Sequence, residues 1–183
     1  MAFNINDIRA QLTFGGARAS LFQVIITNPV NPVADLKLPF LCKAANLPSS
    51  QLGLIEVPYF GRKLKIAGDR VFDAWTVSII NDEDFLIRNA MEQWNNSIQL
   101  YQQNVTALGS GAPSLYKSQA TVTQYGKAGE ILRTYQFNGI FPQAISEIGL
   151  GWGDNDTIEE FNVQFQYDTF EVLNGITGNA GGA

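Results

Sequence analysis

The stretch Thr157–Val172 constrains the fold more than any other part of this chain, because apolar and polar side chains alternate along its centre. Successive side chains of a β-strand point to opposite faces of the sheet, so this alternation predicts a strand with one buried face. We expect the buried face to form part of the core. It comprises Phe161, Val163, Phe165 and Tyr167, and the opposite face comprises Asn162, Gln164, Gln166 and Asp168.

Most of the remaining chain also has the pattern of strands, with β-branched and aromatic runs bounded by glycine, proline and asparagine. The predicted strands are Ser20–Thr27, Phe40–Ala45, Leu54–Pro58, Arg62–Ile66, Val71–Ile80, Gln119–Tyr125, Ile131–Phe137 and a broken strand over Ile140–Leu150. The predicted turns are Tyr59–Gly61, Gly68–Asp69, Gly126–Gly129 and Asn138–Gly139.

One segment, from about Glu83 to Ile98, has the periodicity of an amphipathic helix. Its apolar side includes Trp94, which we expect in the core together with Trp75. Together these patterns predict a mainly β (α+β) fold, an antiparallel β-sandwich or open barrel with one packed helix. A sheet of this kind has edges, which either the fold or an assembly must cover.

Three parts are expected along the chain. Residues 1–19 form a short arm with Asn4 or Asn6 as a candidate N-cap, and residues 20–173 form the β domain. Residues 174–183 form a glycine-rich tail with too little apolar surface to fold alone.

The lack of histidine excludes several kinds of catalysis. Without it, Ser-His-Asp and Cys-His mechanisms and histidine-ligated metals are impossible. Cys42 is the only cysteine, so the chain has no intrachain disulfide and no cysteine-cluster zinc site. Its apolar neighbours favour a position in the core. We expect no cofactor and no metal.

No run approaches the ~20 apolar residues that span a bilayer, and the N-terminus lacks the pattern of a signal peptide. The sequence therefore predicts a chain without a membrane anchor that is made in the cytoplasm.

The charge is low and unevenly distributed. The chain has 17 acids and 12 bases, only 16% of its residues are charged, and it contains 15 Asn and 13 Gln. No Lys or Arg follows Arg133. A tight grip on nucleic acid needs clustered bases that displace counterions, so this composition argues against one. It remains compatible with a wall that nucleic acid slips past.

Three clusters have a chemical and a structural interpretation. Asn81–Asp84 could bind a metal, but acids before a helix more often cap it. Asp154–Asp156 is followed by neither the glycine nor the glutamate of a calcium loop. Gly149–Gly153 is followed by a strand, where a phosphate cradle needs a helix. Trp152 in that loop could be a ligand platform, although a buried anchor at an edge or interface is the better interpretation.

A small basic run lies beside two aromatic residues, Tyr59 and Phe60. Strand alternation divides its charges between two faces, and Glu56 and Asp69 offset them. The run is either a solvated hairpin or a charged contact with a neighbouring subunit. It comprises Arg62, Lys63, Lys65 and Arg70.

Several stretches together resemble the tail tube protein of large contractile-tailed (myovirus) bacteriophages. The likeness runs in order from about Leu21 to Tyr167 and is most specific over Gly61–Asp82. The stretches are Leu21–Val24, Phe40–Pro48 (FLCKAANLP), Pro58–Arg70 (PYFGRKLKIAGDR), Phe72–Val77 (FDAWTV), Asn81–Glu83 and the helix residue Trp94.

The resemblance implies a structural virion protein that is not an enzyme. In that family, β-sandwich subunits form hexameric rings, which stack into a tube inside a contractile sheath. Four strands from each subunit line a shared barrel of twenty-four strands, and DNA passes through its lumen. The implied partners are further copies of the chain, the tail sheath protein, the baseplate and tail terminator proteins and, transiently, double-stranded DNA. Assembly is expected in the host cytoplasm.

The resemblance also implies that the long hairpin, about Leu52–Gly68, and the N-terminal arm reach neighbouring rings. The residues predicted to make contacts between subunits are Leu54, Glu56, Tyr59, Phe60, Arg62, Lys63, Lys65 and Arg70. The acids predicted to face the lumen are Glu56, Glu159, Asp168 and Glu171. The predicted core anchors are Trp75, Trp94, Phe161, Val163 and Phe165.

Other functions remain open from the sequence. A related tube of a phage-tail-like contractile injection system would deliver protein in place of DNA. A β-sandwich binding module would hold sugars on exposed rings such as Tyr59, Phe60 and Trp152. An enzyme is the weakest alternative, because no pair of carboxylates has a spacing that indicates one.

Overall fold

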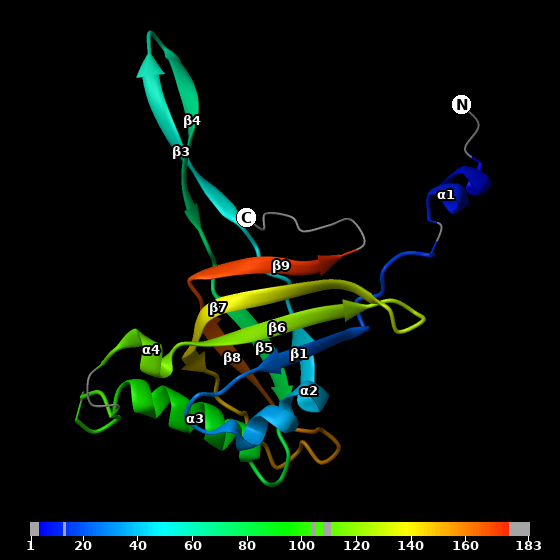
Figure 1. Cartoon of the computed structure of the whole chain (residues 1–183). Coiled ribbons are helices and arrows are strands. Elements are labelled where there is room, and N and C mark those ends of the chain that lie inside the picture. Colours follow the sequence, from blue (N-terminus) through cyan, green and yellow to red (C-terminus); the bar gives the residue numbers. More distant parts are fainter. Residues whose placement is uncertain (1–3, 13, 104, 108–110, 176–183) are drawn as a thin grey trace.

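Two antiparallel sheets enclose the core in the computed structural model of the chain (Figure 1). The structure describes residues 4–12, 14–103, 105–107 and 111–175. One sheet has the strand order β1-β6-β7-β9 and the other β7-β8-β5-β2, so that β7 belongs to both. A separate hairpin joins β3 and β4. The strands are β1 (Phe22–Ile26), β2 (Cys42–Ala45), β3 (Gln51–Tyr59), β4 (Arg62–Val71), β5 (Trp75–Ile80), β6 (Ser118–Tyr125), β7 (Ile131–Ile145), β8 (Glu160–Gln166) and β9 (Thr169–Gly175).

This architecture confirms the predicted mainly β, antiparallel fold with one substantial helix. That helix is α3, and the other helices of the described residues are short. The helices are α1 (Ile5–Gln11), the 3-10 helix η1 (Pro32–Leu36), α2 (Leu38–Leu41), α3 (Leu86–Ile98) and α4 (Pro113–Tyr116). Of the two candidate caps, Asn4 caps α1, because its side chain accepts the Asn6 N–H.

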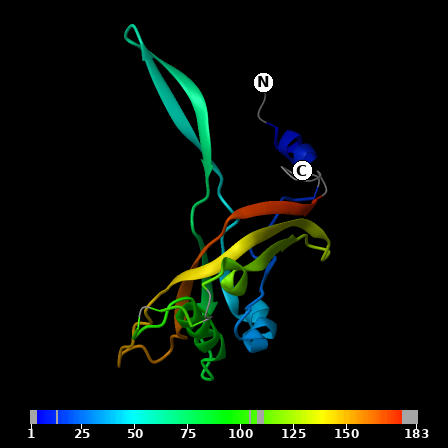
Figure 2. The same cartoon turned by 60° about the vertical axis from the view of Figure 1, so that its left-hand side comes forward.

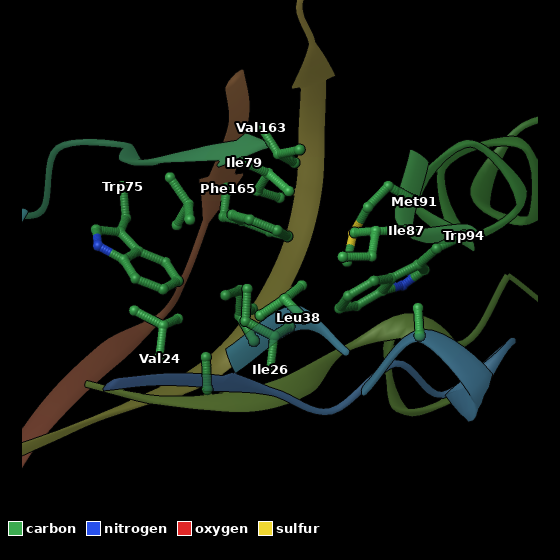
Figure 3. Close-up of a cluster of buried hydrophobic side chains, with 14 of the residues drawn as sticks. Val24, Ile26, Leu38, Trp75, Ile79, Ile87, Met91, Trp94, Val163 and Phe165 are labelled. Carbon is green, nitrogen blue, oxygen red and sulfur yellow. The ribbon is translucent and has the colours of Figure 1, made fainter. Parts of the chain in front are cut away.

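The core contains large side chains from both sheets and from α3 (Figure 3). Trp75 stacks on Phe137 of the facing sheet, with ring centroids 4.4 Å apart. Phe165 lies between the two buried tryptophans, 5.7 Å from Trp75 and 6.2 Å from Trp94. Each indole N–H donates to a backbone carbonyl, that of Trp75 at 2.7 Å and that of Trp94 at 2.8 Å. The aromatic contacts therefore fix how the sheets and the helix pack together.

The long strand β7 passes from one sheet to the other at Gly139. Asn138 pairs with Thr169 of β9, whereas Phe141 pairs with Gln166 of β8. Gly139 has φ +70°, a backbone conformation that glycine adopts without steric cost. The predicted turn at Asn138–Gly139 is therefore wrong, because this glycine bends a strand without ending it.

The predicted turn at Gly68–Asp69 is also wrong, since both residues lie within β4. A Cβ on Gly68 would lie 3.1 Å from the backbone of Gly53 on the paired strand. The register shifts at the same place, between Leu52 and Leu54. This glycine therefore permits two backbones to approach closely at an irregular point of the hairpin.

The helix α3 begins three residues later than the sequence predicts. Phe85 has φ +52°, which is not a helical conformation, so the helix cannot extend upstream through it. Asp84 accepts the Leu86 N–H at 3.0 Å, as the capping interpretation of this acidic cluster predicts. Asp82 and Asp84 also accept hydrogen bonds from Lys37, which lower the pKa of both carboxyls.

Several predicted strands have different limits, and the predicted strands Ile131–Phe137 and Ile140–Leu150 both belong to β7, which ends at Ile145. Phe40 and Leu41 close α2, which starts next to Pro39, so the second strand begins at Cys42. Val71 ends β4 and β5 begins only at Trp75. The predicted strand over Thr157–Val172 is two strands, β8 and β9, separated at Asp168. The alternation continued through this turn because Tyr167 is also buried.

The C-terminal strand β9 includes Asn174 and Gly175, which the sequence assigned to the tail. The rest of the predicted tail, residues 176–183, lies outside the described residues.

Candidate assembly surfaces

The β3–β4 hairpin extends well away from the sandwich (Figures 1 and 2). All of its residues are exposed except Gly53 and Gly68, which are half-buried. None belongs to the core cluster. An isolated two-stranded hairpin is only marginally stable in water. We therefore expect a partner to cover the exposed side chains of this one.

The register of the hairpin divides its side chains into two unlike faces. Ile55 pairs with Ile66 and Val57 with Leu64, which gives one face a row of four exposed aliphatic side chains. The other face carries Glu56 with Lys63 and Lys65, and Lys63 forms an ion pair with Glu56. The sequence predicted this division of charges, and the register confirms it. The apolar face is the part of the hairpin that a partner would desolvate.

The tip of the hairpin carries two aromatic rings. Phe60 and Gly61 form the turn, and both have positive φ, +42° and +80°. Glycine adopts this conformation easily, but a bulky side chain rarely does. Phe60 is 92% exposed, and its ring packs edge-to-face on Tyr59 with centroids 4.6 Å apart. The monomer therefore holds a large apolar ring in water on a strained backbone.

The remaining predicted contact residues also lie on the hairpin. Leu54 is exposed, and Arg62 and Lys65 have no ion-pair partner among the described residues. Arg70 lies near the base, where its guanidinium donates to the Ser50 hydroxyl. The structure thus brings all eight predicted contact residues onto one projecting element.

The sheet β1-β6-β7-β9 has an outer face without any Lys or Arg. Register and strand alternation place one acid and one aliphatic residue on this face among hydroxyls and amides. Neighbouring members bond to one another, since the Thr123 and Thr134 hydroxyls lie 3.3 Å apart and Asn138 donates to Glu171 at 3.3 Å. Among the described residues the face includes Gln23, Ile25, Gln119, Thr121, Thr123, Tyr125, Thr134, Gln136, Asn138, Thr169, Glu171 and Asn174, and the Tyr125 hydroxyl donates to Gln23 at 2.9 Å.

Sequence reasoning missed this face. The alternation of threonine and glutamine with apolar residues over Gln119–Gln124 was a signal that could have revealed one strand of it. Membership of the other strands depends on pairing between distant segments, and no local pattern gives that pairing.

The four acids predicted to face a lumen do not lie together. Glu171 is on the outer face just described, and Asp168 lies at the β8–β9 turn, where its carboxylate accepts from Lys117 at 2.7 Å. Glu56 is on the hairpin. Glu159 lies just before β8 and accepts from the Asn81 amide at 2.8 Å. Of the four acids, only Glu171 therefore lies on the outer face of the sheet β1-β6-β7-β9, and only Asp168 lies beside that face.

The loop between β7 and β8, residues 146–159, forms a second exposed apolar surface. Trp152 is fully exposed in the chain, so it is not an anchor buried within the subunit. Leu150 and Ile158 are exposed beside it. With Ile148 and the acids Asp154, Glu159 and Glu160, these residues line a hollow of about 540 Å³. An interface with another protein and a platform for a ligand are the remaining interpretations of the tryptophan.

The N-terminal arm exposes apolar side chains as well. Helix α1 buries none of its residues, and Ile5, Ile8 and Leu12 are exposed. Between the arm and the β6–β7 turn lies a hollow of about 560 Å³, lined in part by Leu12 and Phe14. In the monomer this arm is held by few contacts.

The described residues offer little for catalysis. They contain no group of three His, Cys, Asp or Glu side chains that could hold a metal ion. Burial raises the pKa of the Cys42 thiol to about 12, which makes it a poor nucleophile. No described helix is both long enough and apolar enough to cross a membrane. The notable surfaces are therefore those suited to protein contacts.

Comparison with known proteins gives these surfaces a context. Residues 6–173 match the model of a family described as phage tail tube protein. The chain belongs to the phage tail tube protein family. Membership makes it a structural subunit of an inner tail tube, and therefore a component of the virion.

Individual relatives agree with this assignment. Tail tube protein gp19 of Enterobacteria phage T4 is 35% identical over 169 residues, covering 91% of this chain and 99% of the relative. The tail tube protein of Serratia phage KSP90 is 27% identical over 168 residues, covering 89% of this chain and 93% of the relative.

Solved structures share the fold at lower identity. The cap of the anti-feeding prophage tube has a TM-score of 0.64 at 18% identity, covering 87% of this chain and 92% of that one. A chain from the sheath–tube complex of an extracellular contractile injection system has a TM-score of 0.55 at 17% identity. The match covers 94% of this chain and 99% of that one. At this identity the likeness concerns the fold alone.

Proposed function

We propose that copies of this chain join as six-membered rings, and that the rings stack into a hollow tube through which double-stranded DNA leaves the virion. The observation that carries the proposal is the outer face of the sheet β1-β6-β7-β9, which is polar and contains no Lys or Arg. We infer that this face lines the lumen.

The dimensions of such a lumen are adequate. Four strands from each of six copies give a barrel of twenty-four strands. With strands about 4.8 Å apart and tilted by about 40°, the circumference is about 150 Å and the diameter about 48 Å. Joining β9 of one copy to β1 of the next closes the barrel and pairs both edge strands of the sheet β1-β6-β7-β9 in every copy. A duplex fits inside with room for side chains.

The chemistry of the face suits passage without binding. Binding of DNA is driven largely by cations that displace counterions from phosphates. Threonine, asparagine and glutamine side chains offer no such charge, and Glu171 repels phosphate. The two lumen acids that we propose are therefore Glu171 and, at the rim of the face, Asp168. Glu56 and Glu159 lie on other elements and remain predictions.

The remaining partners follow from the proposed tube. The outer surface of the tube would meet a contractile sheath, and its two ends would meet baseplate and terminator proteins. The N-terminal arm and the hairpin would bind neighbouring copies, which would cover their exposed apolar side chains. We infer that the chain is not an enzyme, which agrees with its lack of histidine.

Cryo-electron microscopy of the concentrated protein, seeded with baseplates of the same phage, tests the architecture. We expect six-fold tubes with Thr121 and Gln136 facing the lumen. A tube with this sheet on its outer surface would refute the assignment.

A charge test addresses DNA passage. Thr121→Lys with Gln136→Lys adds two cations per copy to the proposed lumen, while Asn162→Lys with Gln164→Lys adds them to the outer face of the other sheet. We expect both variants to build tubes, and only the first to slow DNA release, with relief at high salt. Equal release from both would contradict the lumen assignment. Tubes that carry protein in place of DNA would favour the injection-system alternative.

A further inference from the structure

We propose that the hairpin tip of each copy docks onto the β7–β8 loop of a copy in the next ring. This inference rests on the proposed function, because it assigns the contact that would stack the rings. The two surfaces are the tip, residues 57–65, and the loop, residues 146–159, taken together with Glu160, the first residue of β8.

The two surfaces lie at opposite ends of the molecule. In Figures 1 and 2, which differ by a rotation about the vertical axis, the hairpin tip is at the top and the β7–β8 loop is at the bottom. A contact between two different patches at opposite ends is heterologous, and such a contact repeats without limit along one direction. This is the geometry that a stacked tube needs.

Each surface exposes the kind of residue that dominates protein interfaces. Aromatic and arginine side chains contribute most of the binding energy at typical interfaces. The tip presents Tyr59, Phe60 and Arg62, and the loop presents Trp152 beside its hollow. The strained, exposed Phe60 stabilises nothing in the monomer beyond its contact with Tyr59. Such strain is typical of functional positions.

The charges of the two surfaces are complementary. The hairpin, residues 51–71, carries four bases and two acids, whereas residues 146–160 carry five acids and no base. Among the described residues, Arg62 and Lys65 on the hairpin have no ion-pair partner. Asp154 and Asp156 on the loop have none either. Each end thus holds charges that the fold leaves available for the other.

The occupant of the loop is therefore a second copy of this chain. A copy supplies both the basic tip and the aromatic rings, and it is present at every level of a tube. Docking would place the tip rings against Leu150, Trp152 and Ile158, with the free bases beside the loop acids. Two basic tips or two acidic loops would repel each other, which would disfavour tip-to-tip and loop-to-loop contacts. The two ends of the tube would therefore differ.

Charge reversal tests the pairing. The tip variant combines Arg62→Glu with Lys65→Glu, the loop variant combines Asp154→Lys with Asp156→Lys, and the third variant carries all four changes. Tube growth is measured by sedimentation and electron microscopy, with baseplate seeds of the same phage. We expect each two-residue variant to raise the critical concentration for tubes at least tenfold, and the four-residue variant to return it to within about threefold of the original.

Gln164→Glu on the exposed outer face of β8 serves as a control for charge alone and should leave the critical concentration for tubes within about threefold of the original. Urea unfolding of each monomer verifies that the variants fold. A second probe avoids charge altogether. Trp152→Ala should block stacking, and Phe60→Gly should block it while making the hairpin turn less strained.

Other outcomes separate the two proposals. If the two-residue variants stack normally, or if the four-residue variant fails to recover, the pairing is wrong while the tube stands. If the loop variant builds normal tubes that no longer bind sheath, the loop is a sheath contact and the pairing is again wrong. If the unaltered chain forms neither rings nor tubes on baseplates, the proposed function itself fails.

Discussion

Replacing Trp75 with alanine measures how much the contact between the two sheets stabilises the subunit. The indole is 3% exposed, and truncating a buried tryptophan costs about 3–5 kcal/mol. Loss of the stack on Phe137, at 4.4 Å, adds about 0.5–1.5 kcal/mol. The carbonyl of Asn46 loses its donor at 2.7 Å, but Asn46 is exposed and water can replace that bond. The expected total is about 3.5–6.5 kcal/mol.

This loss is comparable with the whole stability of a typical domain, about 5–15 kcal/mol, so the alanine variant should be largely unfolded in low urea. Trp75→Phe keeps a ring against Phe137 and loses only part of the volume and the N–H donor. It should cost about 1–3 kcal/mol. Trp152→Ala is the matched control, because Trp152 is fully exposed, and it should change the free energy of unfolding by less than about 0.5 kcal/mol.

Urea unfolding of the monomer, followed by circular dichroism, measures the loss for Trp75→Phe and Trp152→Ala directly, and for Trp75→Ala gives the loss or, if no folded baseline remains, its lower limit. The reasoning requires the order Trp75→Ala, then Trp75→Phe, then Trp152→Ala, from most to least destabilised. A loss below about 1.5 kcal/mol for Trp75→Ala would show that the two sheets do not depend on this contact.

Three further predictions concern the subunit alone. The hydrogen bonds from Lys37 hold the pKa of Asp82 and Asp84 below the ordinary 3.8, so this stabilisation is fully present above about pH 4 and is lost as the pH falls through the lowered values. Lys37→Met should therefore lower the urea midpoint at pH 7, with a difference from the unaltered chain that shrinks below pH 4; a constant difference would contradict the ion pair. Since burial raises the pKa of Cys42 to about 12, about one thiol in ten thousand is ionised at pH 8, and a thiol reagent should label this half-buried cysteine far more slowly than a free one; equal labelling rates would contradict the raised pKa. Gly139→Ala should lower the free energy of unfolding by about 1–2 kcal/mol, because residue 139 has a φ of +70°. An unchanged melting temperature would exclude strain at this bend.

The sequence predicts strands well where burial is one-sided and local. Phe161, Val163 and Phe165 alternate with amides, and their burial in β8 follows directly from that alternation. Glycine is harder to interpret. Gly68 and Gly139 were assigned to turns, yet each lies within a strand, because a glycine that ends a strand and one that lets a strand bend have the same local pattern. The partner strand decides between them.

One of the candidate surfaces could be predicted from local sequence, and the other could not. The unlike faces of the hairpin follow from the spacing of Glu56, Lys63 and Leu64, since both strands and the turn are adjacent in the chain. The outer face of the sheet β1-β6-β7-β9 combines residues as far apart in the chain as Gln23 and Thr123. The composition shows an excess of amides, but only the strand order shows that five of them, with several threonines, lie on this one face.

The distribution of polarity offers a reason for the low overall charge. A wall in contact with DNA must carry no cations, and a face between subunits must carry few charges that would be desolvated. In this chain, charge is concentrated instead at the hairpin and at the β7–β8 loop, where it can select one direction of contact. A chain with the usual charge spread over its whole surface would be a more soluble monomer but a poorer tube, because its cations would retard DNA and its desolvated charges would weaken every joint. In the proposed tube, low charge and uneven charge would therefore be two aspects of one requirement, which is association in a single defined geometry around a lumen that does not bind DNA.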